Sequence, residues 1–433
     1  MNLTAKTKFT IFLVIYFTVV IVSELFYRNP LFNKSIPFEV DFQQKFPSDS
    51  FIGKFLSTVT ELGDIAILLY LALIVACFVP YHKFLVLITV IFSGKYIGNL
   101  LKSIYGSPRP NWINKSDNQA LNDYCKLSFA NPSGHSVLSS SFFLSAWHLL
   151  TAQYIQKNKI WQQVLKWITF AFSVFMILCV MISRLYEGVH TINQIIFGCC
   201  IGVGNYLVYF HLLQIHTVSV KKFLDTIKKK IVIIIVVFGI AIVALLLVFF
   251  LIKHDDSEFI EMIKEHCSED KRKKKHKIME YDGLMDTLTI AGPIGMVCAL
   301  MITNFIINKC FYQKENNIFD WISAGFKIRI VQTISFAVIY VGIYILTSFI
   351  TDLIGHKTIL ISSLNSVFEC FFPQLIISTV GIILPYMIME CIFGKQPPRS
   401  DGALLDMNTI GTEQDTVDAP LFKKDVVSES NDA

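Results

Sequence analysis

Long apolar stretches separated by shorter polar loops are the dominant pattern of this 433-residue chain. A stretch of about twenty apolar residues is long enough to cross a bilayer as a helix, and we count about ten. The predicted spans are Phe9–Phe26, Ile65–Val79, Phe84–Ile104, Val137–Ala152, Val164–Ile182, Ile192–Leu213, Ile231–Ile252, Leu288–Ile307, Ile330–Ile350 and Val367–Phe393. The pattern therefore predicts an all-α fold, a polytopic membrane helix bundle.

The spacing of these spans divides the chain into four regions. Residues 1–59 are predicted to form an N-terminal anchor helix and a loop, and residues 60–213 a core of helices two to six. Additional transmembrane helices follow in 214–393. Residues 394–433 are polar and rich in Asp, Ser and Thr, a composition typical of a disordered tail.

Composition supports a membrane protein and gives no indication of a nucleic-acid partner. The chain is 53% hydrophobic and 16% charged, with a net charge of only +5, whereas soluble domains are about 25% charged. Its ten cysteines show no CxxC pair or metal-ligand spacing, so we expect neither a metal nor a cofactor. A disulfide between Cys125 and Cys267, both in predicted loops, is left open.

The distribution of lysines predicts the orientation in the membrane. If the N-terminus is cytoplasmic, the following lysines lie on the same side: Lys6, Lys8, Lys83, Lys157, Lys159, Lys221, Lys222, Lys228, Lys229, Lys230, Lys314 and Lys327. Lys- and Arg-rich loops prefer the cytoplasm, so both termini are predicted there. The loops at 105–136 and 183–191 then face the lumen or the cell exterior, in the endoplasmic reticulum or the plasma membrane. The glycosylation sequons at Asn33 and Asn114 agree with this orientation, whereas the basic run at 271–275 does not.

Three polar motifs lie at the ends of apolar segments on that non-cytoplasmic face. The first is K-S-I-Y-G-S-P-R-P, from Lys102 to Pro110. Its two prolines hold Arg109 on extended backbone, where the guanidinium can grip two phosphate oxygens. Lys102 lies back on the helix and adds a second positive charge. Taken alone, either residue could be an ordinary cation at the membrane interface.

The second motif, Pro132-Ser133-Gly134-His135, opens the fourth predicted helix. Ser133 suits an N-cap, and the free N–H groups of a first helical turn bind anions. An oxyanion can approach the Gly134 backbone closely, and His135 can act as a general acid near neutral pH. Without its neighbours, His135 could equally be a capping histidine.

The third motif joins Ser183-Arg184, at the end of the fifth helix, to His190, at the start of the sixth. Because the chain crosses the membrane out and back between His135 and Arg184, the motifs share one face. Gln194 lies four residues after His190 and can hold its imidazole in one orientation. An oriented imidazole facing a phosphate held by three cations is an activated nucleophile, and this arrangement suits phosphoryl transfer.

Together the motifs resemble the signature of the type 2 phosphatidic acid phosphatase superfamily, K-x6-R-P, P-S-G-H and S-R-x5-H-x3-D, over about residues 60–213. This superfamily also holds glucose-6-phosphatases, dolichyl-diphosphate phosphatases and vanadium haloperoxidases. The resemblance implies that His190 forms a phosphohistidine, that His135 protonates the leaving alcohol, and that no metal is needed. It also implies a set of phosphate-binding residues: Lys102, Arg109, Ser133, Gly134 and Arg184.

The chain departs from this signature at Gln194, where the family usually has Asp. Gln cannot supply the negative charge that raises the basicity of His190, although it can still accept a hydrogen bond. The glucose-6-phosphatase and dolichyl-diphosphate phosphatase branches also have Gln here, so we do not interpret the change as a loss of activity. Glu187 is one hypothesis for the source of the missing charge.

We expect a phosphoric ester hydrolase whose substrate is most simply a lipid phosphate or diphosphate, because the motifs lie level with the headgroups of the bilayer. A glucose-6-phosphatase-like sugar phosphatase is an alternative. So is a catalytically silent lipid-binding, scaffolding or transport protein, since additional helices follow the core. Those helices leave open assembly into a homo-oligomer. Trp112 is predicted to lie in the interfacial aromatic belt.

Overall fold

The computed structural model describes residues 4–79, 81–113, 128–155, 160–214, 217 and 220–252, with isolated positions at 259, 261–263, 298–299, 302, 330, 334, 338 and 342. All regular elements in this part are helices, which confirms the all-α prediction. These residues belong to one compact unit, Met1–Pro385. Apart from the isolated positions, the three predicted spans after residue 252, the basic run and the tail lie outside the described residues.

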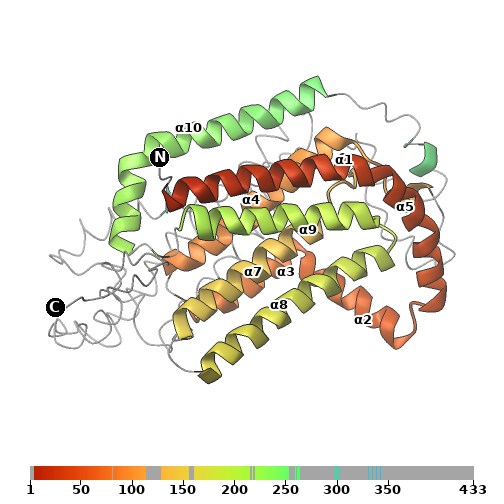
Figure 1. The fold of residues 1–433 in the computed structure, drawn as a ribbon, viewed down its shortest axis with the longest axis horizontal. Coiled ribbons are helices and arrows are strands. Elements are labelled where there is room, and N and C mark those ends of the chain that lie inside the picture. The colour runs from red at the N-terminus through yellow and green to blue at the C-terminus, as the bar shows by residue number, and fades with distance from the viewer. Residues whose placement is uncertain are drawn as a thin grey trace, which may run out of the picture. The chain divides into compact units, whose positions relative to one another are not determined.

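The first helix is longer than the sequence pattern predicted. Helix α1 spans Ala5–Lys45 and contains Pro30 and Pro37. A proline inside a helix removes one backbone donor and bends the helix, and α1 changes direction in its second half (Figure 1). The prediction of a loop after Phe26 is therefore wrong for most of that segment. Helix α1 continues through it, and α2 follows at Phe51–Val59.

The next span is broken. A short 3-10 turn, η1 (Thr60–Gly63), separates α2 from α3 (Ile65–Ala76), and the chain bends by 72° there. The Asp64 carboxylate begins α3 by accepting a hydrogen bond from the Ala66 N–H at 2.9 Å. This bend places η1 and the start of α3 inside the bundle, beside the ends of other helices.

The remaining helices follow the predicted spans closely, except that the last of them begins eleven residues before its predicted span. Helix α4 covers Tyr81–Tyr105, and the four-residue α5 begins at Pro110. After residue 128 come α7 (Gly134–Tyr154), α8 (Ile160–Tyr186) and α9 (Ile192–Leu207), which continues as the π-helical turn η2 (Val208–Leu212). Helix α10 spans Val220–Leu251 and packs on α4, where the Tyr96 hydroxyl donates to the Ala241 carbonyl at 2.7 Å.

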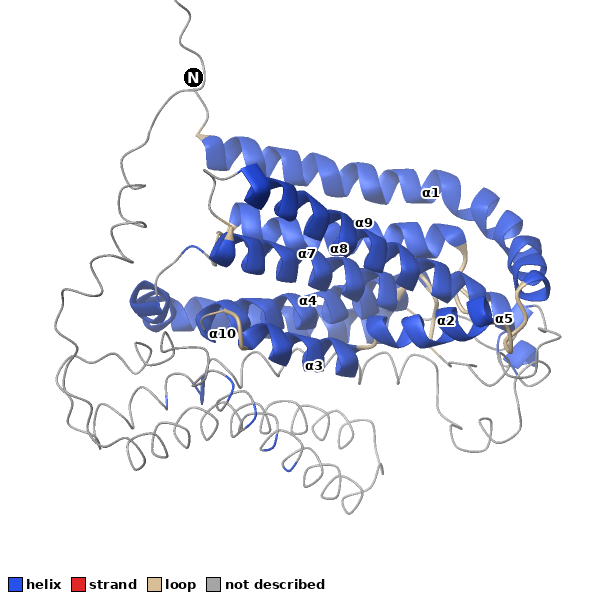
Figure 2. Cartoon of the chain, turned by 90° about the horizontal axis from the view of Figure 1, so that it is seen from below, coloured by secondary structure: helices blue, strands red, loops and turns tan. Residues whose placement is uncertain are grey.

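Within the described part, four helices are long and apolar enough to cross a membrane, or five if the bent pair forms one span. The predicted total of about ten is not tested by this part of the chain. Helix α7 is missing from this set because of its serines. These serines are fully buried, since α7 packs against α4, α8 and α9 (Figures 1 and 2); they are Ser136, Ser139, Ser140, Ser141 and Ser145. Their hydroxyls therefore face other helices rather than lipid.

Helices α7 and α9 approach each other closely at two glycines of α9. A Cβ atom added at Gly202 would lie 1.9 Å from Ser140 Oγ, and one at Gly198 would lie 2.6 Å from the Ser133 carbonyl oxygen. Small residues four apart permit such contact between membrane helices. As a result the starts of the two helices meet, and the Ser133 N–H donates to the Gln194 carbonyl at 3.0 Å.

Helix α1 lies alongside α9 and contributes buried polar side chains to the loops that begin α7 and α9. The Glu24 carboxylate accepts a hydrogen bond from Asn131 Nδ2 at 2.8 Å, just before the second motif. Ser35 Oγ accepts from the Ile192 N–H at 3.1 Å, at the first residue of α9. An ionisable residue at membrane depth usually has a specific partner, and here that partner is a loop of the candidate site.

We predict that Gly202→Val will destabilise the protein by about 1–3 kcal/mol or more, because the new side chain overlaps α7. Gly239→Val is the matched control, since a Cβ at Gly239 would meet nothing within 4 Å. Thermal unfolding of both variants in detergent measures the difference. Equal unfolding midpoints for the two variants would contradict the close contact between α7 and α9.

Candidate active site

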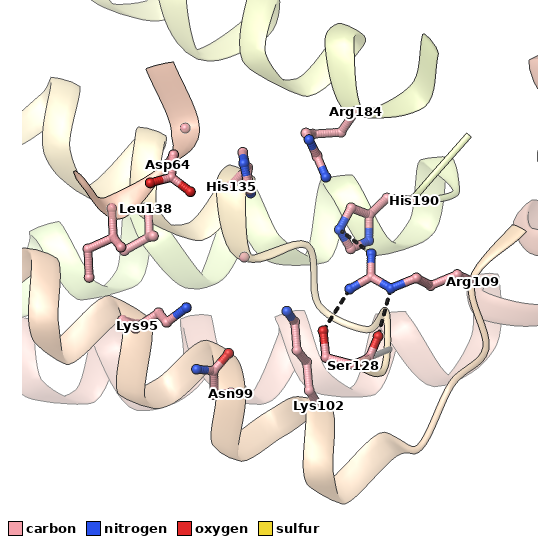
Figure 3. A pocket seen from close by; sticks show the side chains of 13 residues that line it. Asp64, Lys95, Asn99, Lys102, Arg109, Ser128, His135, Leu138, Arg184 and His190 are labelled. Carbon is pink, nitrogen blue, oxygen red and sulfur yellow. Dashed lines mark hydrogen bonds between the residues drawn. The ribbon is translucent and has the colours of Figure 1, made fainter. Parts of the chain in front are cut away.

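The three sequence motifs converge on one cavity of about 80 Å³. A single water needs roughly 10–15 Å³ in such a measure, so the cavity has room for a group the size of a phosphate. The predicted site residues that line it are Lys102, Arg109, Gly134, His135, Arg184 and His190 (Figure 3). Ser133 and Gln194 lie behind this lining. The cavity also contains residues that were not predicted: Asp64, Lys95, Asn99 and Ser128.

His190 is 2% exposed, and both of its ring nitrogens have neighbours. Nε2 lies 3.4 Å from Arg109 NH1, and Nδ1 lies 3.3 Å from Gln194 Oε1. A guanidinium can only donate, so Nε2 must be the acceptor and the ring proton lies on Nδ1. Gln194 is itself fixed, because its Oε1 accepts from the Thr191 N–H and its Nε2 donates to the Pro108 carbonyl. The lone pair of Nε2 therefore points toward the guanidinium of Arg109, which lines the cavity together with His190.

The surroundings of His190 keep its ring neutral. Burial lowers the pKa of His190 well below its ordinary value, and the nearby charges of Arg109, Arg184 and Lys102 lower it further. The hydrogen bond to Gln194 raises the pKa but does not offset these effects. A neutral imidazole carries the free lone pair that a nucleophile needs.

Arg109 is 1% exposed, and its guanidinium binds the loops around the cavity. Nε donates to the Ser128 carbonyl at 2.6 Å, and NH2 donates to Ser128 Oγ at 3.0 Å (Figure 3). NH1 donates to the Val189 carbonyl at 3.1 Å. The Arg109 guanidinium thus connects the loop that precedes the second motif with the loop that precedes His190. A bound phosphate oxygen would compete for NH1, whose contact with His190 Nε2 is the longer of its two.

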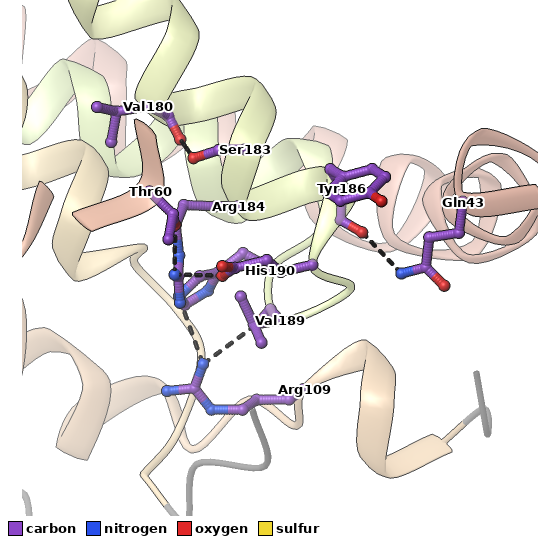
Figure 4. A network of polar contacts seen from close by, with 10 residues as sticks. Gln43, Thr60, Arg109, Val180, Ser183, Arg184, Tyr186, Val189 and His190 are labelled. Carbon is purple, nitrogen blue, oxygen red and sulfur yellow. Dashed lines mark hydrogen bonds and ion pairs between the residues drawn. The ribbon is translucent and has the colours of Figure 1, made fainter. Parts of the chain in front are cut away.

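Arg184 lies on the opposite wall and is 3% exposed. Its NH1 donates to Thr60 Oγ1 at 2.7 Å and forms an ion pair with the Glu187 carboxylate (Figure 4). The negative charge of Glu187, which was a candidate partner for His190, is therefore directed at Arg184. Gln43 of α1 fixes the end of α8 by donating to the Tyr186 carbonyl at 2.8 Å.

The start of α7 forms the third wall. Ser133 is its N-cap residue, as predicted, but its buried hydroxyl has no hydrogen-bond partner in the structure. A Cβ at Gly134 would lie 3.4 Å from Lys102 Nζ, so the ammonium group rests against the glycine backbone. The ring of His135 fills space left by Gly63, where a Cβ would lie 2.8 Å from it. The N-terminus of α7 and the Lys102 ammonium group together favour an anion here.

The sequence contained a signal for two of the additional cavity residues. Lys95, Asn99 and Lys102 are spaced by four and three residues on α4, so they share one face of an otherwise apolar helix. Asp64 has no such pattern and enters the cavity only because of the bend before α3.

Trp112 corrects another prediction. Its side chain is fully buried against Phe129 and Ile263, so it does not lie in an aromatic belt. The loop at 114–127, including the second sequon, lies outside the described residues.

Residues 83–217 match the family model of the PAP2 superfamily. The match includes all three motifs, whereas Glu24, Thr60 and Asp64 precede it. Neither the comparison with curated proteins nor that with solved structures gives a match. Over residues 83–217, the chain is thus similar to the PAP2 superfamily, in agreement with the resemblance that the three motifs carry.

Proposed function

We propose that the protein is a membrane phosphatase that hydrolyses the phosphate monoester or diphosphate of a lipid without a metal, through a phosphohistidine at His190. The observation that carries the proposal is the convergence of two imidazoles and three cations on one small cavity. The match of residues 83–217 to the PAP2 family model supports hydrolysis of phosphate esters in general. The lipid, the covalent intermediate and the orientation in the membrane are our inference.

In the first step, the Nε2 lone pair of His190 attacks phosphorus and forms an N–P bond. The bond from phosphorus to the leaving oxygen breaks, and His135 donates a proton to that oxygen. Lys102, Arg109 and Arg184 balance the charge on the other phosphate oxygens, as phosphoryl transfer requires. Figure 3 shows the two histidines on either side of the space into which Lys102 points.

In the second step, His135 accepts a proton from water, whose oxygen attacks the phosphohistidine. The N–P bond breaks, inorganic phosphate leaves, and His190 returns to its neutral form. The hydrogen bond from Nδ1–H to Gln194 holds the ring in place in both steps. Gln194 thus supplies orientation without the negative charge of the usual Asp.

A lipid substrate is supported by the position of the cavity at the ends of apolar helices. Helix α4 ends at Tyr105 and α8 at Tyr186, and we infer that these helix ends lie near the headgroups of the bilayer. A substrate phosphate could bind there while its chain remains in the bilayer. The catalytically silent alternative is weakened because both histidines and all three cations line the same cavity.

We predict that His190→Ala will reduce phosphate release by at least about a thousandfold, because the nucleophile is lost. Wild-type and variant membranes would be assayed with phosphatidate, sphingosine 1-phosphate, a polyprenyl diphosphate and glucose 6-phosphate, with and without EDTA. His148→Ala is the control, since His148 bonds Tyr206 at the other end of α7. Activity that EDTA abolishes, or that survives in His190→Ala, would refute the mechanism.

The pH dependence provides a second test. Because the pKa of His190 is lowered, kcat/KM should fall on the acid side only well below the ordinary histidine pKa of about 6.5. Gln194→Glu places a negative charge beside Nδ1, which raises the pKa and moves the acid limb upward by about 1–3 pH units. The exposed Gln214→Glu should leave the profile unchanged. An acid limb that stays in place or moves downward in Gln194→Glu would contradict the assignment of His190.

The proposed lumenal or extracellular position of the site predicts latency. In sealed vesicles with the cytoplasmic side outward, hydrolysis of membrane-impermeant p-nitrophenyl phosphate should be low and should rise severalfold after permeabilisation with detergent. His190→Ala vesicles provide the background. Full activity in intact vesicles would place the site on the cytoplasmic face.

A further inference from the structure

The cavity extends past His135 toward α3 and the middle of α4. Asp64, Lys95 and Asn99 line this extension, with Leu138 beside them (Figure 3). In the proposed mechanism His190 attacks from one side of the phosphate and His135 protonates the leaving oxygen on the other. The leaving group must therefore point into this extension.

Asn99 provides evidence that the extension is a binding site. Its side chain is 3% exposed, and its Nδ2 atom has no hydrogen-bond partner in the structure. A buried amide without a partner costs about 1–3 kcal/mol. A ligand that accepts a hydrogen bond from Asn99 would remove this cost.

We propose that Asp64, Lys95 and Asn99 form a subsite for a leaving group with hydroxyl groups close to the scissile ester, an inference that rests on the proposed phosphatase activity. The three side chains provide both donors and an acceptor: an ammonium, an amide and a carboxylate. A hydroxyl group can donate and accept at once, so it matches this mixture.

The alternatives fit the subsite less well. A second phosphate would bring negative charge toward the half-buried Asp64 carboxylate, and like charges repel each other. A purely alkyl leaving group would leave the Asn99 amide unsatisfied. Sites that bind a substrate hydroxyl discriminate strongly against analogues that lack it, for this reason.

Two substrate sources carry this chemistry. One is a soluble sugar phosphate, and the other is a lipid with a hydroxyl near its phosphate, such as a sphingoid phosphate. Glucose 6-phosphate and n-hexyl phosphate form a soluble pair of equal carbon number. Sphingosine 1-phosphate and a polyprenyl monophosphate form the lipid pair. A higher kcat/KM for the hydroxylated member of each pair would support the subsite. The pair with the higher kcat/KM values identifies the source of the substrate as soluble or lipid.

The test uses the full chain in detergent, with Asn99→Leu and Asp64→Asn as variants. Asn retains the capping of α3, since Asn and Asp are both good N-cap residues. We expect kcat/KM for the hydroxylated substrate to fall by about 10- to 100-fold, while that for the matched alkyl phosphate changes by less than about threefold. Ser93→Ala, on α4 but bonded to Asn205, is the control and should retain the wild-type preference.

Three outcomes would overturn the proposal. The first is a wild-type protein that hydrolyses both members of each pair equally well. The second is an equal loss for both members in Asn99→Leu, which indicates a structural role. The third is a selective loss for a polyprenyl diphosphate, which indicates that the subsite binds a second phosphate. If wild type and His190→Ala are equally inactive on every substrate, the phosphatase function itself fails, and the subsite fails with it.

Discussion

Close contact between α7 and α9 is the constraint on which the site depends. In a membrane, helices gain little from burying apolar surface against each other, so van der Waals contact and hydrogen bonds must hold them together. Gly198 and Gly202 allow α9 to reach the α7 backbone, and Ser141 Oγ donates to the Gly202 carbonyl at 3.1 Å. His190 precedes one helix and Gly134 begins the other. A larger side chain in the contact would separate the two, and a displacement of about 1 Å can cost a hundredfold in rate.

Charge is the second constraint. Four cations line the cavity with one carboxylate, Asp64. Burying charges is costly unless polar groups compensate, and the protein provides backbone carbonyls for Arg109 and the Glu187 carboxylate for Arg184. Neither partner cancels the positive potential at the centre, where a phosphate would supply the missing negative charge. Burial and the same potential lower the pKa of His190, so in the proposed mechanism one set of cations would serve both phosphate binding and nucleophile activation.

Local sequence rules predicted the parts of the structure that depend on short segments. Apolar length predicted α4, α8 and α9, and the motif spacing predicted which residues would meet, because two membrane crossings return the chain to the same face. Contacts between segments that lie far apart in the sequence could not be predicted from these local rules. The apolar pattern ended the first span at Phe26, whereas α1 continues to Lys45 and packs alongside α9.

The contacts of individual side chains also could not be predicted from the sequence. Glu187 lies three residues from both Arg184 and His190, and sequence distance alone could not choose between them. Trp112 resembles an interfacial residue until its buried neighbours are known. Asp64 enters the cavity only through the bend before α3, which no motif encodes.

Helix α1 shows that the functional unit is larger than the family domain. The match begins at residue 83, yet Glu24 holds the loop before Ser133, Ser35 holds the first residue of α9, and Thr60 holds Arg184. A chimera built by transplanting only residues 83–217 would cut each of these buried bonds. Domain boundaries for engineering this protein should therefore begin upstream of α1, since the N-terminal helix holds the loops of the candidate site in place.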